Sequence, residues 1–326
     1  MKRWESAFLL VGILLVALSV RVVGLGWGEG QPIHPDEEFL RQVTVAVQWP
    51  NSLTLYLDTS RSPLNPYNRG YGFFVYGTFP LFLTRAVGEA LDQGCRNGEA
   101  VSLLSRWLAP VLLGNPAVCW PGAFSGTGTR HLGRLLAALF DTGSVLFVFL
   151  AARVLASGKD SPALPPLAAL LYALTVLPIQ QSHFYTVDSF ANFFVAATLY
   201  LALALAQTQT LGWGVPLAFL GGLAIGLGVA CKISVWPLGL LVALAVFLHA
   251  RRSAHGDVGR AARAVVLLGL LALVGAFLAF RLAQPYAFLG PGFFGLRLNP
   301  RWLQNMAEVR SLMSGAVDTY PGHQWT

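Results

Sequence analysis

The chain has 326 residues, of which 55% are hydrophobic and 11% are charged, and its formal net charge is +7. This composition excludes a soluble enzyme and is typical of an integral membrane protein. The sequence also contains no P-loop, no dinucleotide-binding fingerprint and no G-x-S-x-G elbow. Nucleotide-driven transport and serine hydrolysis therefore have no support.

Several stretches are long and apolar enough to cross a bilayer, which takes roughly 20 residues. They predict an all-α integral membrane protein, a multi-span helical bundle of about seven spans, in which residues 1–326 form a single membrane domain. The first span follows the basic start MKRWES and no small-residue cleavage site comes after it, so we expect a retained anchor helix. The windows cover approximately residues 7–25, 132–156, 163–181, 189–206, 213–231, 233–250 and 264–283.

The distribution of Lys and Arg over the short loops predicts the orientation. Lys2 and Arg3 place the N-terminus in the cytoplasm, and the basic loops 153–159 and 251–263 then fall on the same side. The positive charge is thus explained by topology and calls for no nucleic-acid partner. We expect an external loop at 26–130, a helical bundle at 131–283 and an external segment at 284–326.

The external loop is too patterned to be a simple connector. Two apolar stretches, 72–91 and 100–113, each carry an internal arginine, Arg85 and Arg106 respectively. We expect helices that lie along the outer interface with these arginines snorkelling to water. An extra hairpin through the membrane is the alternative, and it would raise the number of spans to nine. The loop also holds Cys95 and Cys119, which either pair or stay as free thiols.

The most informative motif is His34-Pro35-Asp36-Glu37, shortly after the first span. The whole chain contains only 15 acidic residues, and three of them, Asp36, Glu37 and Glu38, lie together here. One interpretation is a solvated helix start after Pro35, because acidic residues suit the first turn of a helix. The other is a pair of carboxylates that does chemistry at the membrane surface.

Further polar residues fall at the same, external ends of the spans. Ionisable groups in or near a bilayer usually face a bundle interior or a wet cavity. Asp141 lies within the second span, where an interhelical ion pair is an equal possibility, and Asp188 could simply cap the helix that follows it. The others in this set are Arg21, His183, Lys232, Arg281 and Tyr286.

These groups together suit a particular pair of substrates. Carboxylates at the water edge provide a base for an acceptor hydroxyl or amine, and cations at headgroup depth bind the phosphate of a lipid-linked donor. Lys232 is the strongest phosphate candidate, because the topology rule does not place a positive charge at an outward turn.

The chain resembles the GT-C superfamily of polyprenyl-phosphate-sugar-dependent glycosyltransferases, and in particular bacterial relatives of the dolichyl-phosphate-mannose-protein mannosyltransferases and aminoarabinose transferases. The resemblance covers essentially the whole chain. It is carried by Arg21 and by the strings HPDE at 34–37, RLLAALFDTGSVLFVFLAARVLASG at 134–158, SHFYTVD at 182–188, ACKISVWPL at 230–238 and QPYAF at 284–288.

The resemblance implies a GT-C-like fold and an inverting transfer of sugar from a polyprenyl-phosphate carrier. Asp36 would be the general base that deprotonates the acceptor, and Glu37 would orient the acceptor or raise the basicity of Asp36. Lys232, Arg281 and Arg21 would stabilise the leaving phosphate. The remaining expected substrate-binding residues are His34, His183, Asp188 and Tyr286.

The resemblance also implies partners and a location. The donor would be a polyprenyl-phosphate-linked sugar, the acceptor a protein, a lipid or a glycan, and the active site would lie on the extracytoplasmic face of the cell membrane. The resemblance implies no definite cofactor, and a divalent cation held by Asp36 and Asp188 is left open.

Two features depart from the family pattern. YGTFPLF at 76–82 stands where the protein mannosyltransferases carry a His-Pro-Pro-Leu-type string, and only Pro80 and Leu81 fit. Family members also continue beyond the position of Thr326, so we expect an N-terminal fragment. The competing interpretations are a polytopic transporter or lipid flippase with a polar cavity near the outer leaflet, and a structural scaffold. A polar site at mid-depth would favour the transporter.

Overall fold

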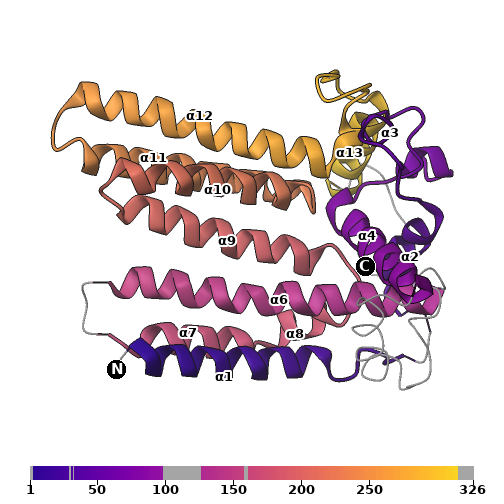
Figure 1. The fold of residues 1–326 in the computed structure, drawn as a ribbon, viewed down its shortest axis with the longest axis horizontal. Helices are drawn as coiled ribbons and strands as arrows, with labels where there is room; N and C mark the ends of the chain where they lie inside the picture. The colour runs from indigo at the N-terminus through magenta and orange to yellow at the C-terminus, as the bar shows by residue number, and fades with distance from the viewer. Residues whose placement is uncertain (1–2, 29–30, 32, 98–125, 158–160, 315–326) are drawn as a thin grey trace.

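The computed structural model describes residues 3–28, 31, 33–97, 126–157 and 161–314. Every element named in these ranges is a helix, and the single isolated β-bridge of the described part joins Phe288 to Leu298. Long helices lie side by side, and short ones gather at one end of them (Figure 1). The expected all-helical architecture is confirmed for this part of the chain.

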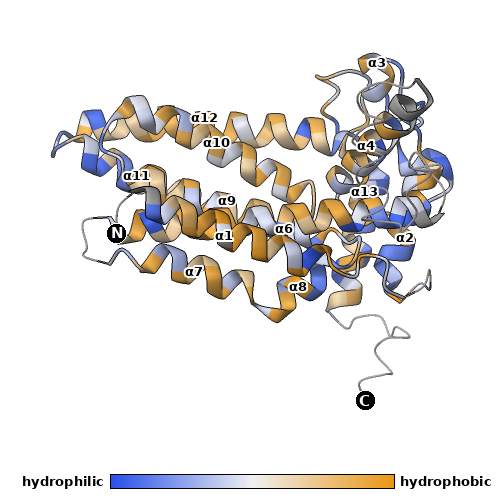
Figure 2. Ribbon diagram, turned by 60° about the horizontal axis from the view of Figure 1, so that its bottom comes forward, coloured by the Kyte–Doolittle hydropathy of each residue, from blue (hydrophilic) through white to orange (hydrophobic). Residues whose placement is uncertain are grey.

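Six of the described helices are long and apolar enough to cross a membrane. Their apolar middles and hydrophilic ends are visible in Figure 2. Many large apolar side chains on them are exposed, for example Phe8, Leu270 and Leu273, as expected for a surface that faces lipid. The six are α1 (Arg3–Val22), α6 (Gly126–Ala156), α9 (Asp188–Gln207), α10 (Leu211–Val229), η2 (Ile233–Leu238) continued by α11 (Gly239–Ser253), and α12 (Val258–Ala283).

The window expected at 163–181 is not one straight helix. It divides into α7 (Leu164–Ala173) and α8 (Val176–Ser182), which are bent by 54° and make a seventh span only if they count together. Pro178 explains the break, because a proline clashes with the carbonyl four residues before it, here that of Leu174. The Ala173 carbonyl at the break accepts a hydrogen bond of 2.9 Å from Arg21 Nη1.

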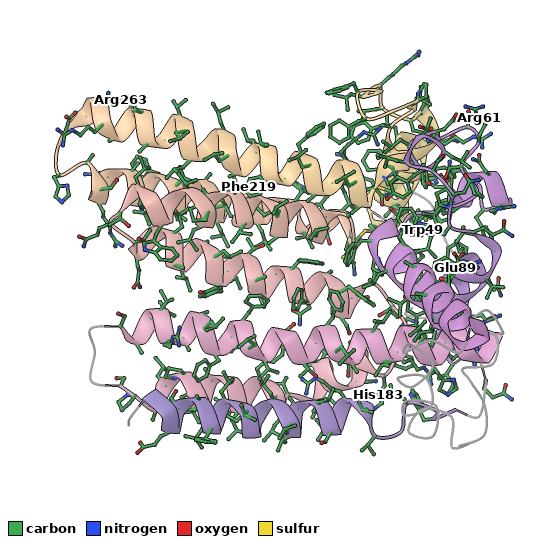
Figure 3. All side chains as sticks on the ribbon, viewed as in Figure 1. Trp49, Arg61, Glu89, His183, Phe219 and Arg263 are labelled. Atoms are coloured by element: carbon green, nitrogen blue, oxygen red, sulfur yellow. The ribbon has the colours of Figure 1, made fainter. Side chains whose placement is uncertain are left out.

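Successive spans run in opposite directions, as the sequence predicts. The N-terminal end of α1 lies with the α9–α10 and α11–α12 connections, and α2, α3, α4 and α13 lie at the other end (Figure 1). Arg263 is at the first end, whereas Trp49, Arg61 and Glu89 are at the second (Figure 3). The chain therefore has the architecture of a multi-pass helical membrane protein.

The tightest contact in the bundle is between α10 and α12. A Cβ atom on Gly222 would lie 2.0 Å from the Ala272 carbonyl oxygen, and one on Gly226 would lie 2.3 Å from that of Ala276. Small residues four positions apart let two backbones approach closely, which is a common way for membrane helices to associate.

The short elements at the second end are joined to the bundle by the largest cluster of buried apolar side chains. This cluster includes Leu40 and Leu81 from the short helices and Phe190 and Phe194 from α9. The elements at this end are α2 (Pro35–Ala46), α3 (Leu53–Tyr56), η1 (Pro66–Arg69), the longer α4 (Thr78–Asn97), η3 (Pro285–Ala287) and α13 (Pro300–Met313).

The apolar stretch 72–91 becomes helical only at Thr78, where α4 begins. The prediction that Arg85 snorkels to water is wrong. Its side chain is 9% exposed, and it donates to Glu89 Oε1 at 2.6 Å and to the carbonyls of Thr44 and Val45. The expected helix at 100–113 with Arg106 and the side chains of Cys95 and Cys119 lie outside the described residues.

The segment before α4 is held against the turn between α10 and η2. Gly77 N donates to the Cys231 carbonyl at 3.0 Å, and Phe79 N donates to that of Ala230 at 3.1 Å. A Cβ atom on Gly77 would lie 1.9 Å from the Ala230 oxygen. This backbone contact sets Tyr76 beside the turn that carries Lys232.

Gly77→Ala is expected to separate the two segments, because neither backbone can yield without breaking these hydrogen bonds. We expect a loss of about 1–3 kcal/mol in the free energy of unfolding, measured on detergent-purified protein. Gly72→Ala is the matched control, since a Cβ there meets nothing within 4 Å. Equal stability of the two variants would contradict the importance of this contact.

Candidate functional site

The His34-Pro35-Asp36-Glu37 motif forms the start of α2. His34 is the N-cap residue, and its Nδ1 accepts a hydrogen bond of 3.2 Å from Asp36 N. Pro35 occupies the first helical position, where its missing N–H is not needed. The helix start predicted from the sequence is therefore confirmed. It is not uniformly solvated, however, because the three acidic side chains have different surroundings.

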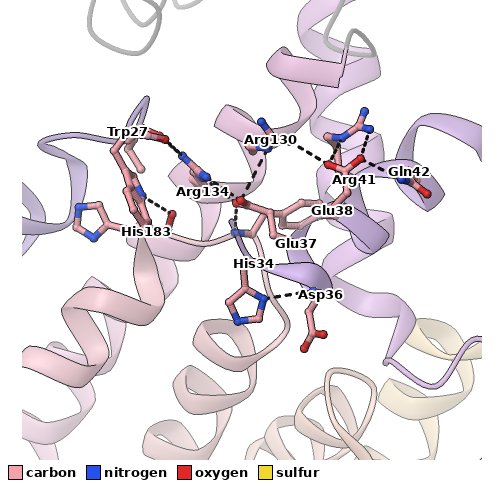
Figure 4. A network of polar contacts seen from close by, with 12 residues as sticks. Trp27, His34, Asp36, Glu37, Glu38, Arg41, Gln42, Arg130, Arg134 and His183 are labelled. Carbon is pink, nitrogen blue, oxygen red and sulfur yellow. Dashed lines mark hydrogen bonds and ion pairs between the residues drawn. The ribbon is translucent and has the colours of Figure 1, made fainter. Parts of the chain in front are cut away.

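Glu37 is buried in a bidentate ion pair. Arg134 Nε and Nη2 donate to its two oxygens at 2.7 Å each, both side chains are 1% exposed, and Tyr185 N donates to Oε1 at 2.8 Å. Arg134 also donates to the carbonyls of Leu25 and Trp27. One arginine on α6 thus connects the first turn of α2 to the end of α1 (Figure 4).

Glu38 points to the surface side of the same turn. It accepts hydrogen bonds from Arg41, Gln42 and Arg130. These hydrogen bonds lower the pKa of Glu38 to about 2, and the one from Arg41 has the largest effect. The carboxylate therefore stays ionised and anchored, and it provides no proton acceptor.

Asp36 differs from both neighbours. Its carboxylate points away from the Glu37–Arg134 pair (Figure 4), is partly exposed, and makes no ion pair with the described residues. The Tyr76 hydroxyl is its neighbour. Burial, and then the charge of Asp36 and a hydrogen bond to it, raise the pKa of Tyr76, and the charge of Asp188 adds to the effect. Tyr76 thus stays protonated beside Asp36.

Asp188 and Lys232 form the other half of this group. Lys232 Nζ lies 2.7 Å from Asp188 Oδ1, and the two side chains are 49% and 39% exposed. Asp188 is the first residue of α9, and Lys232 precedes η2. We call Asp36, Tyr76, Asp188 and Lys232 the surface cluster. Tyr76 was missed from the sequence; its place in YGTFPLF, next to Gly77, carried no chemical signal of its own.

Arg21 does not reach the surface cluster. It is fully buried, and its Nε donates to Asp141 Oδ2 at 2.6 Å. Asp141 Oδ1 accepts from the Tyr172 hydroxyl at 2.7 Å and from Asn192 Nδ2 at 3.3 Å. The interhelical ion pair considered for Asp141 is therefore present, and its partner is Arg21.

Arg281 and Tyr286 are used in packing the segment after α12. The buried Arg281 donates to the carbonyls of Phe293, Gly292 and Pro285, and its guanidinium lies 5.1 Å from the ring centroid of Phe288. The Tyr286 hydroxyl is 2.7 Å from Ser62 Oγ.

His183 and His34, both expected to bind substrate, instead contact other parts of the protein. The ring nitrogens of His183 lie 2.7 Å from the Ile179 carbonyl and 2.9 Å from that of Val23. The ring of His34 lies against Phe184, with 4.8 Å between the centroids.

A divalent cation finds few ligands here. In the part of the chain that the structure describes, no three His, Cys, Asp or Glu side chains are arranged to hold a metal ion. Asp188, one of the two ligands expected from the sequence, is paired with an ammonium group instead.

Comparison with known proteins adds no assignment. No protein-family model matches the chain, and no curated protein sequence matches it significantly.

The Glu37–Arg134 pair makes a direct prediction. Arg134→Met should lower the free energy of unfolding by about 3–5 kcal/mol, because Glu37 remains buried without its main partner. Combining it with Glu37→Gln should restore part of the loss, which a double-mutant cycle in detergent micelles would measure. Arg61→Met is the control: this arginine pairs with Asp58 but is 74% exposed, so its loss should change stability by at most about 1 kcal/mol. Simple additivity of the two buried substitutions would contradict the coupling.

Proposed function

We propose that the chain is an inverting glycosyltransferase that moves a sugar from a polyprenyl-phosphate carrier to an acceptor at the membrane surface. One observation carries the proposal: the carboxylate of Asp36 points away from the clamped Glu37 and lies near Tyr76, which also senses the charge of Asp188, and Asp188 is paired with Lys232. A carboxylate and a cation thus both lie at this end of the apolar bundle.

The reaction would proceed in one displacement. The acceptor hydroxyl or amine gives its proton to Asp36 while its oxygen or nitrogen attacks the anomeric carbon. The bond from that carbon to the phosphate oxygen breaks, and polyprenyl phosphate leaves with the electron pair. Lys232 stabilises the charge that develops on the leaving phosphate, and the anomeric configuration inverts.

The neighbouring residues have positioning roles in this scheme. Glu37 fixes the first turn of α2 through Arg134 and so sets where Asp36 lies. Tyr76 orients the Asp36 carboxylate, and Asp188 holds the flexible Lys232 side chain until a phosphate competes for it.

The other expected phosphate ligands are engaged elsewhere. Arg21 pairs with Asp141, and Arg281 is surrounded by backbone carbonyls, so we assign the phosphate to Lys232 alone. The basic connections at the opposite end of the bundle favour an extracytoplasmic site in the cell membrane. The acceptor is a protein, a lipid or a glycan.

A transporter or lipid flippase is the second candidate. The observation that favours it is the buried polar network of Arg21, Asp141, Tyr172 and Asn192 within the helices, because polar groups at depth line transport pathways.

Asp36→Asn tests the proposed base. We expect a loss of transfer of about 10²–10⁴-fold, the range that general-base catalysis contributes, measured as release of radiolabelled sugar from polyprenyl-phosphate donors by membranes that carry the protein. Glu308→Gln, an exposed acid on α13, is the control and should leave transfer unchanged. Full activity of Asp36→Asn would refute the assignment, and wild type that binds a donor without releasing sugar would favour the transporter.

Lys232→Met tests the phosphate ligand. Loss of a charge-assisted hydrogen bond, about 1.5–3 kcal/mol, should raise the donor KM about ten- to hundredfold, with the acceptor KM little changed. Lys232→Arg should retain most of the affinity, and Arg310→Met, at an exposed arginine on α13, should have no effect. A donor KM unchanged in Lys232→Met would move the phosphate elsewhere.

A further inference from the structure

A pocket opens beside the surface cluster, between α6, α8 and α9. Its volume is about 310 Å³, near the lower end of the range for small-molecule sites. Asp188 belongs both to this pocket and to the surface cluster. The lining residues are Asp141, Leu177, Pro178, Gln181, Asp188, Ser189 and Asn192.

Two of the lining side chains have polar atoms that lack a partner. Ser189 Oγ and Gln181 Oε1 are buried and form no hydrogen bond with the described residues. The Ser189 side chain is almost completely enclosed, with 3% exposure. Buried polar groups are normally paired, so unpaired polar atoms on two residues that line one pocket suggest a ligand that completes them.

The charges of the pocket are already balanced by the protein. Asp141 is paired with Arg21, and Asp188 is paired with Lys232. An anionic ligand would therefore face two carboxylates without a free cation at the pocket. A neutral ligand with several hydroxyl groups finds amide, hydroxyl and carboxylate partners together.

The pocket also has a lipid-facing side. Leu177 lines it and is 63% exposed on α8, and Val176 beside it is 75% exposed. These side chains follow the break between α7 and α8. A ligand in the pocket can therefore stay attached to a chain that runs into the bilayer.

We propose that this pocket binds the sugar of the lipid-linked donor, and that this sugar is a single uncharged monosaccharide. The inference rests on the proposed function. With the sugar between Gln181 and Ser189, the shared residue Asp188 sets the anomeric carbon next to Lys232, which binds the phosphate. The acceptor then approaches from the side of Asp36.

The test is a binding measurement that needs no turnover. Purified wild-type protein would be titrated with three short-chain lipids and followed by thermal shift: polyprenyl phosphate, the same lipid carrying an uncharged hexose, and the same lipid carrying a uronic acid. We expect the hexose lipid to bind more tightly than the other two. Equal binding of all three would overturn the proposal.

Ser189→Ala and Gln181→Leu locate the binding in the pocket. Each removes a group that has no protein partner, so stability should not fall, whereas the preference for the hexose lipid should drop about two- to tenfold. Thr198→Val is the matched control, because Thr198 Oγ1 is also buried and unpartnered among the described residues, on the same helix but outside the pocket lining. It should keep the full preference.

The outcomes separate the two proposals. A hexose preference that both pocket variants retain overturns the sugar site, even if Asp36→Asn abolishes transfer. If the pocket variants lose the hexose preference but the wild-type protein releases no sugar, the sugar site is supported and the transferase reaction is refuted.

Discussion

The buried pair between Glu37 and Arg134 is the interaction on which the candidate site depends. Two charges in a nonpolar interior are stable only when their hydrogen-bonding capacity is filled, and here Tyr185 N and the carbonyls of Leu25 and Trp27 fill it. Arg134 comes from α6, and these partners come from the segments after α1 and before α9, so one ion pair fixes α2 against three parts of the chain. Asp36, one residue away, takes no part in this ion pair, because Glu37 makes the contacts that fix α2.

The charges of the chain are divided between structural and available groups. Glu38, Asp141, Arg21 and Arg281 are held by ion pairs and hydrogen bonds within the protein. Asp36, Asp188 and Lys232 are exposed or partly exposed at the end of the bundle, and Asp188 and Lys232 are paired with each other there.

The sequence predicted much of the fold, since apolar length and loop charge determine spans without knowledge of packing. It also predicted the start of α2, because His34 and Pro35 act locally. It could not predict which cations are used internally: Arg21 meets Asp141 only through the packing of α1 on α6. It missed Tyr76 for the same reason, because that residue gains its role from the contact of Gly77 with the Ala230 carbonyl. The proline at position 178 could have predicted the break, but the continuous hydrophobicity of residues 163–181 favoured a single span.

That interruption has a consequence for the surrounding lipid. A straight helix rises about 1.5 Å per residue, so the stretch from Leu164 to Ser182 would reach only about 28 Å if it were unbent, and the 54° bend shortens it further. This is less than the roughly 30 Å hydrocarbon thickness of an average bilayer. Hydrophobic mismatch of this kind is relieved by local thinning of the membrane. The headgroup layer would dip beside α7 and α8, which brings a lipid phosphate closer to the level of Lys232 without any movement of the protein.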